Sequence, residues 1–252
     1  MLESMIIAFS MYSKIPMPRV EWSKRGMRYS MCFFPLVGCV TGLCSVGIFY
    51  GLHWLNFGTS LVAAVLTVLP ILLNGGIHMD GFLDTVDAKR SYKSKEEKLK
   101  ILKDPHAGAF AILYAGVYLL LSFGAFCEVD AKGICMIAAG YVFSRILSGL
   151  SVVLFPKAKE DGSVAAFADA ARKQVKGVLY IELVLCAVGT ILIDPVTGVV
   201  CVAVSGCTFL YYRLMAFRQF GGITGDLAGY FLQLCELFWL LAVVVTGRIM
   251  VL

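Results

Sequence analysis

The chain has 252 residues, of which 59% are hydrophobic and 15% are charged, and its formal net charge is +5. Soluble globular domains carry about 25% charged residues, so this composition excludes an ordinary soluble enzyme. Because about 20 apolar residues span a bilayer, the long uncharged runs predict an all-α, polytopic membrane helical bundle that occupies residues 1–252 as a single domain.

An apolar segment opens the chain, and residues 1–12 are expected to form a helix that lies at the membrane surface. This segment has neither a basic leader nor a small-residue cleavage site, so we expect no removable signal peptide. Only Asp194 and Pro195 separate the fifth predicted span from the sixth, which predicts a tight hairpin. The seven predicted spans are residues 31–55, 59–79, 107–127, 133–155, 177–193, 196–212 and 229–246.

Basic residues fall almost entirely on one side of this predicted topology. Nineteen Lys and Arg lie before the first span or in the connections after the second, fourth and sixth spans, against two on the other side, Lys132 and Arg248. The positive-inside rule then predicts a multi-pass inner-membrane protein whose N-terminus and large loops, with the active site, face the cytoplasm. Topology explains most of the positive charge, so no nucleic-acid partner is expected.

The connection after the second span begins with NGGIHMDGFLDTVDA, residues 74–88. On a helix, Asp80, Asp84 and Asp87 fall at i, i+4 and i+7 and share one face. Three carboxylates so placed repel one another, and a divalent cation removes that repulsion; hard oxygen ligands favour Mg²⁺ or Mn²⁺ over Zn²⁺. Residues 74–76 either continue the second span or break it, so that the aspartates open a new helix. An ordinary acidic helix start is the competing structural explanation.

The same connection ends with KDPHAGAF, at the start of the third span. Lys103, Asp104 and His106 place a cation, an acid and an imidazole together there, and Lys103 is suited to pair with a phosphate as a point charge. Pro105 fits the first turn of the third span and Asp104 its N-cap. Capping is therefore a complete structural alternative to a catalytic role for Asp104.

A glycine-rich stretch, RQFGGITGDLAGYF, leads into the seventh span. Gly221, Gly222 and Gly225 let the backbone come close to a bound group, and a helix start preceded by such residues is a ready anion site. Thr224 and Asp226 add oxygen atoms, although Asp226 is also a candidate N-cap. Glycine-rich turns are common, so the argument depends on this stretch lying on the same membrane face as the aspartates.

Ionisable residues also lie inside predicted spans, where they are costly and usually face the bundle interior or a water-filled cavity. Arg145, in YVFSRILSGL, is a candidate partner for phosphate or for a metal-site carboxylate. Glu236 lies ten residues beyond Asp226 and is expected to line the floor of the same cavity. Glu182 has no motif around it and is expected to form a structural pair.

Five motifs, in order, give the chain a resemblance to the cobalamin synthase family, the adenosylcobinamide-GDP ribazoletransferases. They are FSMYSKIPMP, NGGIHMDGFLDTVDA, KLKILKDPHAGAFAIL, FSRILSG with FPKAKEDG after it, and FGGITGDLAGYFLQLCEL. The family's usual aspartate block reads roughly GGxHxDGxxDTxDG, and only its last glycine differs here, being Ala88. An acidic pair in the family's final motif stands here as Gln233 and Glu236, which puts a role for position 233 in doubt.

The resemblance implies a phosphotransfer in the last steps of cobamide biosynthesis, with Mg²⁺ required. Adenosylcobinamide-GDP would meet the 5′-hydroxyl of α-ribazole, or α-ribazole 5′-phosphate, and give adenosylcobalamin, or its phosphate, and GMP. The metal ligands would be Asp80, Asp84, Asp87 and Asp226. The catalytic residues would be His78, Lys103, Asp104, His106 and Arg145. The substrate contacts would come from Gly75, Gly76, Gly221, Gly222, Thr224, Gly225 and Glu236.

Phosphoryl transfer asks mainly for charge neutralisation and alignment, which suits these residues. In this scheme Mg²⁺ would stabilise the leaving GMP, and Lys103 and Arg145 would neutralise the remaining phosphate oxygens. His78, His106 or a spare aspartate would serve as the base, and the sequence leaves that choice open. The partners expected are the two small-molecule substrates and the lipid bilayer, and the sequence allows a homo-oligomer.

Two alternatives compete with this interpretation. A CDP-alcohol phosphotransferase that makes phospholipid also clusters aspartates at a membrane helix end, but its signature, roughly DxxDGxxAR followed by GxxxDxxxD, is absent. An ion-coupled transporter would use the intramembrane Arg145, Glu182 and Glu236. Transporters place their binding groups at mid-membrane between two related halves, whereas the acids here gather on one face and the halves do not match.

Overall fold

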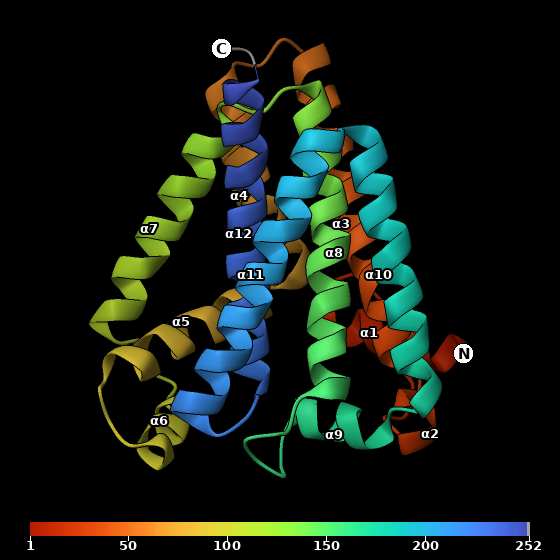
Figure 1. Ribbon diagram of the computed structural model, residues 1–252, viewed down its shortest axis with the longest axis vertical. Helices are drawn as coiled ribbons and strands as arrows, with labels where there is room; N and C mark the ends of the chain where they lie inside the picture. Colours follow the sequence, from red (N-terminus) through yellow and green to blue (C-terminus); the bar gives the residue numbers. More distant parts are fainter. Residues whose placement is uncertain (251–252) are drawn as a thin grey trace.

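A computed structural model describes residues 1–250, which form twelve helices and no β-strand. The helices are α1 (Leu2–Tyr12), α2 (Lys24–Met27), α3 (Ser30–Trp54), α4 (Thr59–Asn74), α5 (Ile77–Arg90), α6 (Lys95–Ile101), α7 (Ala109–Phe126), α8 (Ala131–Leu154), α9 (Ser163–Ala170), α10 (Lys173–Ile193), α11 (Pro195–Phe220) and α12 (Gly225–Ile249). Figure 1 shows the long helices running side by side along one axis.

Six helices, α3, α7, α8, α10, α11 and α12, are long and apolar enough to cross a membrane. Helices α4 and α5 pass the same test only as a pair, and the pair is bent by 94°. The protein is therefore an all-α polytopic membrane bundle, as the composition predicts. The predicted end of the second span, at residue 79, is wrong, because α4 stops at Asn74 and α5 turns across the bundle (Figure 1).

Helices α8 and α12 are the most buried of the six, and α10 is the least buried. The hairpin predicted at Asp194 and Pro195 is confirmed: Asp194 accepts a hydrogen bond from the backbone N–H of Thr197 at 3.0 Å and pairs with Lys132. Gly198 packs on Ile191, since a Cβ at Gly198 would lie 2.7 Å from the Ile191 Cα. The fifth and sixth spans are longer than predicted, because α10 begins four residues earlier and α11 runs eight residues further.

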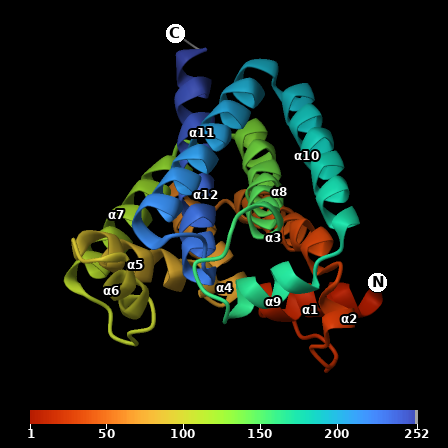
Figure 2. The ribbon, with the colours of Figure 1, turned by 60° about the horizontal axis from the view of Figure 1, so that its bottom comes forward.

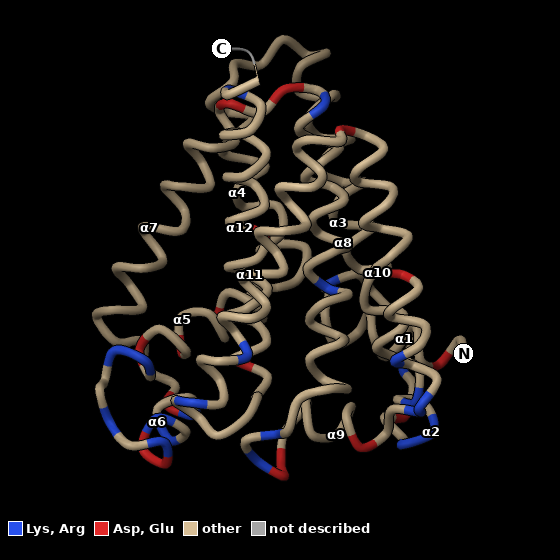
Figure 3. The backbone as a smooth tube through the Cα atoms, in the orientation of Figure 1, with Lys and Arg blue, Asp and Glu red and all other residues tan. Residues whose placement is uncertain are grey.

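Charged residues gather at one end of the bundle, here called the polar end, which comprises α1, α2, α5, α6, α9 and the helix termini beside them (Figure 3). Figure 2 shows this end turned forward, with α5, α6, α9, α1 and α2 arranged around the ends of the long helices. The opposite end carries only a few charges. Helix α1 exists as predicted and buries Ile6, Ile7 and Ala8, while its place at a membrane surface stays a prediction.

The bend between α4 and α5 depends on two consecutive glycines. Gly75 and Gly76 have φ of +66° and +80°, which places both in the left-handed region that favours glycine. The side chain of Asn74 accepts a hydrogen bond from the Gly76 N–H at 3.0 Å and steadies the turn. Lys14 covers Gly75, because a Cβ there would lie 2.1 Å from the Lys14 Cε. The bend sends the aspartates of α5 across the polar end instead of along a span.

Candidate active site

Helix α5 crosses α12 where each helix carries a glycine. A Cβ at Gly81 would lie 2.8 Å from the Asp226 Cα, and one at Gly229 would lie 3.2 Å from the His78 Cα. Only residues without a side chain allow so close an approach of two backbones. The crossing brings the acidic face of α5 to the first turn of α12, where Asp226 lies.

Asp84 lies at the centre of the acidic cluster. Partial burial, followed by the charges of Asp80, Asp226, Asp87 and Asp104, raises the pKa of Asp84 to about 7. The three aspartates of α5 share one helix face, as the spacing predicts, and the charges of Asp226 and Asp104 from two other segments also act on Asp84. A site in which burial and neighbouring acids raise the pKa of one carboxyl toward neutral pH is suited to take up a cation.

Asp87 has a structural role that the sequence did not predict. Its carboxylate accepts hydrogen bonds from the backbone N–H groups of Gly108, at 2.6 Å, and Ala111, at 2.9 Å, and so caps the first turn of α7. The expectation that Asp104 caps this helix with Pro105 in its first turn is wrong, because α7 starts at Ala109 with Gly108 as its N-cap. A residue from α5 supplies the acceptor instead.

A first pocket of about 130 Å³ opens at the polar end beside the α5–α12 crossing. Asp80 and Asp226 form its acidic side, and Tyr12 and Phe34 form an aromatic wall. His78 also lines it and stacks on Tyr12, with ring centroids 5.9 Å apart. The pocket thus combines carboxylates with flat apolar surfaces.

A second pocket of about 240 Å³ adjoins the first and is lined by charges of both signs, with Asp161 and Asp226 beside two lysines. Lys103 and Lys159 line it, together with the N-terminal end of α9. Burial and the neighbouring Lys103 lower the pKa of Lys159, so an anion bound between the two lysines would relieve their repulsion. Asp226 and Ser163 line both pockets, so the two pockets are adjacent and share a wall.

Lys159 and Ser163 are site residues that sequence reasoning missed. Both follow the fourth span, in or just after the motif FPKAKEDG, whose two lysines and acid–glycine turn are the signal that points to them. Backbone hydrogen bonds position this segment: Ile223 N–H donates to the Pro156 carbonyl at 3.0 Å, and Ala158 N–H donates to the Ile223 carbonyl at 2.9 Å.

The glycine-rich stretch before α12 forms part of the site, with distinct roles for its members. Gly221 ends α11 with φ of +81°, and Gly222 packs on the segment at residues 156–158, so these two shape the turn. Thr224, and not Asp226, is the N-cap of α12, because its hydroxyl accepts a hydrogen bond from the Leu227 N–H. Gly225 lines both pockets.

His78 is buried, and burial followed by the charge of Arg145 lowers its pKa to about 3. The ring is therefore neutral at pH 7, and its Nε2 has no hydrogen-bond partner among residues 1–250. A neutral imidazole with so low a pKa is a weak base. The residue lines the first pocket, although this nitrogen is itself buried.

Lys103, Asp104 and His106 lie on the exposed connection between α6 and α7. Lys103 pairs with Asp161 at 3.3 Å across the second pocket. Asp104 accepts hydrogen bonds from the backbone and the ring of His106, and these bonds lower its pKa. Of the three, the structure brings Lys103 into the pocket lining and leaves His106 mostly in solvent.

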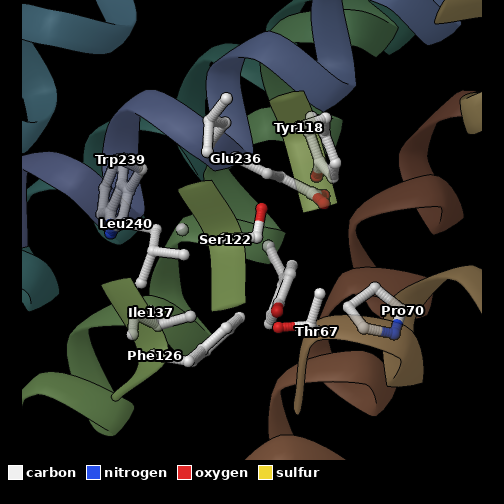
Figure 4. Close-up of a pocket in the computed structure, with 12 residues that line it drawn as sticks. Thr67, Pro70, Tyr118, Ser122, Phe126, Ile137, Glu236, Trp239 and Leu240 are labelled. Atoms are coloured by element: carbon white, nitrogen blue, oxygen red, sulfur yellow. The ribbon is translucent and has the colours of Figure 1, made fainter. Parts of the chain in front are cut away.

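Arg145 and Glu236 pair with each other inside the bundle, at 2.7 Å, and Arg145 is fully buried. The expected contact between Arg145 and a phosphate would therefore require the side chain to move, because no part of it reaches solvent. Glu236 lines a separate pocket between α4, α7, α8 and α12, with Thr67, Tyr118 and Ser122 around it (Figure 4). These two residues lie beneath the site and apart from the acidic cluster.

The aspartates of the site differ in how free their oxygens are to bind a metal ion. Asp80, Asp84 and Asp226 offer hard oxygens and form no salt bridge among residues 1–250, whereas both oxygens of Asp87 already accept N–H groups. Within that range no three His, Cys, Asp or Glu side chains are arranged to hold an ion by themselves. The donor set fits Mg²⁺ if phosphate oxygens complete the coordination, which is the usual arrangement for this ion.

Comparison with known proteins gives one consistent result. A family model described as cobalamin-5-phosphate synthase matches residues 4–244. An adenosylcobinamide-GDP ribazoletransferase of Lachnoclostridium phytofermentans is 49% identical over 251 residues, covering 99% of this chain and 96% of the relative. Proteins of the same name from Clostridium perfringens and Desulfitobacterium hafniense are each 31% identical, over 91% and 93% of this chain and 92% and 94% of their own. No solved structure matches the chain.

Proposed function

The chain belongs to the cobalamin-5-phosphate synthase family, and we propose that it catalyses the reaction named by its relatives, adenosylcobinamide-GDP ribazole transfer. A ring hydroxyl oxygen of the ribose of α-ribazole, or of α-ribazole 5′-phosphate, whose 5′ oxygen is already esterified, forms a bond to the phosphorus that carries the cobinamide. The bond from that phosphorus to the oxygen bridging the diphosphate breaks, GMP leaves, and the hydroxyl proton passes to solvent or to a base.

The observation that carries this proposal is the pair of adjacent pockets that share Asp226, with Asp80 lining the first and Lys103 and Lys159 lining the second. A diphosphate needs both kinds of group, because cations neutralise its outer oxygens and carboxylates hold the metal that bridges them. The phospholipid-synthase and transporter alternatives receive no support from the relatives, which all carry the ribazoletransferase name.

Mg²⁺ belongs to the proposal and rests on the chemistry of the donor set. Asp80, Asp84 and Asp226 would hold the ion, which would supply charge neutralisation at the leaving GMP. The chain's own residues bind and align the substrates: Lys103 and Lys159 attract the diphosphate, while the ring of His78 and the wall of Tyr12 and Phe34 border the space for a planar group.

The unequal charge of the two ends supports a topology for this reaction. Among residues 1–250 the polar end carries nearly all Lys and Arg, and the positive-inside rule places such an end in the cytoplasm (Figure 3). We therefore propose an inner-membrane enzyme with its N-terminus and active site on the cytoplasmic side.

Purified protein in detergent, supplied with Mg²⁺, adenosylcobinamide-GDP and α-ribazole, tests the activity. GMP and a cobalamin product are expected in equal amounts, and product is expected to fall at least a hundredfold in Asp84→Asn, because the metal set loses a charge. Glu96→Gln, an exposed acid on α6, is the matched control and keeps wild-type turnover. No GMP release from wild type, or equal turnover in Asp84→Asn, would contradict the assignment.

A further inference from the structure

The last turn of α5 carries a second cluster of charged side chains, Lys89 and Arg90. At 100° per residue, Lys89 lies about half a turn around the helix from Asp80, Asp84 and Asp87. Lys89 Nζ donates to the hydroxyl of Tyr230 at 2.7 Å and to that of Tyr211. The neighbouring Arg90 donates to the hydroxyl of Tyr114.

These residues enclose a pocket of about 80 Å³ between α5, α7 and α12, here called the Lys89–Arg90 pocket. It is lined by Phe82, Val86, Lys89, Arg90, Tyr114, Tyr230 and Leu234. Figure 1 shows the end of α5 meeting the start of α7 at this edge of the bundle. The pocket shares no residue with the two pockets of the candidate active site.

The charge in this pocket lacks a counter-charge. Among residues 1–250 neither Lys89 nor Arg90 pairs with a carboxylate, and their contacts are phenol hydroxyls and ring faces, with Lys89 Nζ 4.8 Å from the Tyr230 ring centroid. Lys98 lies near enough that the charge of Lys89, after burial, lowers its pKa. Adjacent cations held by neutral groups at an apolar rim attract an anion.

An apolar track continues from the pocket into the spanning part of the bundle. On α7, Val117 and Leu121 follow Tyr114 by three and seven residues, so they lie on the same helix face, and they are 50% and 45% exposed. On α12, Phe238 follows Leu234 by four residues and is 40% exposed. A free phosphate has no apolar part that could contact these side chains, whereas the apolar part of an amphipathic anion would cover them.

We propose that the Lys89–Arg90 pocket binds the headgroup phosphate of an anionic phospholipid whose acyl chains lie along the track of Val117, Leu121 and Phe238. Basic pockets between membrane helices bind anionic headgroups, and tyrosines at that depth present a hydroxyl to the phosphate and a ring to the chains. The lipid would contact α5, which carries the acidic cluster, together with α7 and α12. It would thereby stabilise the position of α5 from the side opposite the active site.

Native mass spectrometry of the protein in neutral detergent, titrated with phosphatidylglycerol or with phosphatidylcholine, measures this binding. We expect one phosphatidylglycerol to bind more tightly than any phosphatidylcholine. Lys89→Gln/Arg90→Gln is expected to weaken phosphatidylglycerol binding about thirtyfold, since each cation near an anionic headgroup contributes about a kilocalorie per mole. Lys93→Gln/Lys95→Gln removes the same charge from exposed positions of the same connection and is expected to bind as wild type does.

Three results would overturn the proposal: equal weakening in the two double variants, equal affinity for the two lipids, or displacement of phosphatidylglycerol by glycerol 3-phosphate at equal concentration. The last would indicate a site for small phosphates. Tyr114→Phe keeps the ring and removes the hydroxyl that contacts Arg90, and it covers the case in which the double variant fails to fold. A tighter or unchanged affinity in a folded Tyr114→Phe protein would also count against the site.

Discussion

Gly81 on α5 lies directly against Asp226 on α12: a Cβ added at position 81 would lie 2.7 Å from the Asp226 carbonyl oxygen. The two backbones carry the carboxylates of the site, so their separation sets the spacing of the carboxylates. Gly81→Ala is expected to push the helices apart, at a cost of about 1–3 kcal/mol in the free energy of unfolding. A shift of about 1 Å is expected to lower turnover about a hundredfold.

Turnover and the thermal midpoint of the purified variant check this prediction. Gly116→Ala on α7 is the control, because a Cβ there meets nothing within 4 Å. Equal turnover in the two alanine variants would show that the close crossing does not position the carboxylates.

The raised pKa of Asp84 predicts how stability depends on pH without metal. Its pKa rises from 3.8 to about 7, so between those values the folded protein holds a proton that the unfolded chain releases. The free energy of unfolding therefore falls as pH rises from about 4 to about 7. Asp84→Asn is expected to flatten this slope. Thermal midpoints at pH 5 and pH 8 in EDTA measure it, and Glu96→Gln should keep the wild-type slope.

Bound Mg²⁺ is expected to raise the free energy of unfolding at alkaline pH, where the ionisation of Asp84 has lowered it. Above pH 7 Asp84 is ionised, and an ion bound to the folded state alone stabilises it by about 2.7 kcal/mol when present at a hundred times its dissociation constant. We expect Mg²⁺ to raise the thermal midpoint at pH 8 and to have little effect at pH 5, where protons compete for the carboxylates. Asp226→Asn should lose the rise; a rise of equal size in that variant would place the ion elsewhere.

Asp87 is expected to matter for α7 as well as for the acidic cluster. Asp87→Ala removes both acceptors from the first turn of α7 and should cost about 1 kcal/mol. The matched control is Asp130→Ala, because Asp130 caps α8 through the Gly133 N–H within its own helix. Hydrogen exchange at residues 108–111 should speed up in Asp87→Ala alone. Faster exchange there in Asp130→Ala too would indicate a general loosening of the bundle.

The buried pair of Arg145 and Glu236 predicts strong coupling. Arg145→Met leaves a carboxylate in the bundle core without a charged partner, held only by the Ser144 hydroxyl, which should cost about 3–5 kcal/mol, whereas Arg145→Met/Glu236→Gln should cost much less than the sum of the single changes. A double-mutant cycle on thermal unfolding measures the difference. The exposed pair of Arg248 and Glu128 gives the reference, about 0–1 kcal/mol. Additive losses at Arg145 and Glu236 would show that the pair is not coupled.

Sequence periodicity was enough to predict the convergence of Asp80, Asp84 and Asp87, because a helix face follows directly from spacing. The membrane bundle and the hairpin at Asp194 follow from composition and from a single Asp-Pro step in the same way. Contacts between distant segments were beyond this reasoning. The capping of α7 by Asp87 joins residues more than twenty positions apart, whereas a local pattern points to Asp104, which is close to the helix start in the sequence.

Arg145 and Glu236 illustrate the same limit inside the membrane. Each was assigned to the site because charge in a span is rare, and their mutual pairing depends on the packing of α8 against α12, which no local pattern encodes. Lys159 was overlooked for the opposite reason: a lysine in a basic connection looks like an ordinary solvated charge until the backbone bridge between residues 157 and 223 draws it to the pocket.

The shortness of α4 has a consequence for where catalysis takes place. Its 16 residues measure about 24 Å at the usual rise, against a hydrocarbon layer of about 30 Å. Helix α5 accordingly lies above the lower ends of α8 and α11 (Figure 1). The carboxylates would then lie at the depth of the lipid headgroups. The thickness of the bilayer would therefore change how deep the active site lies relative to the membrane surface.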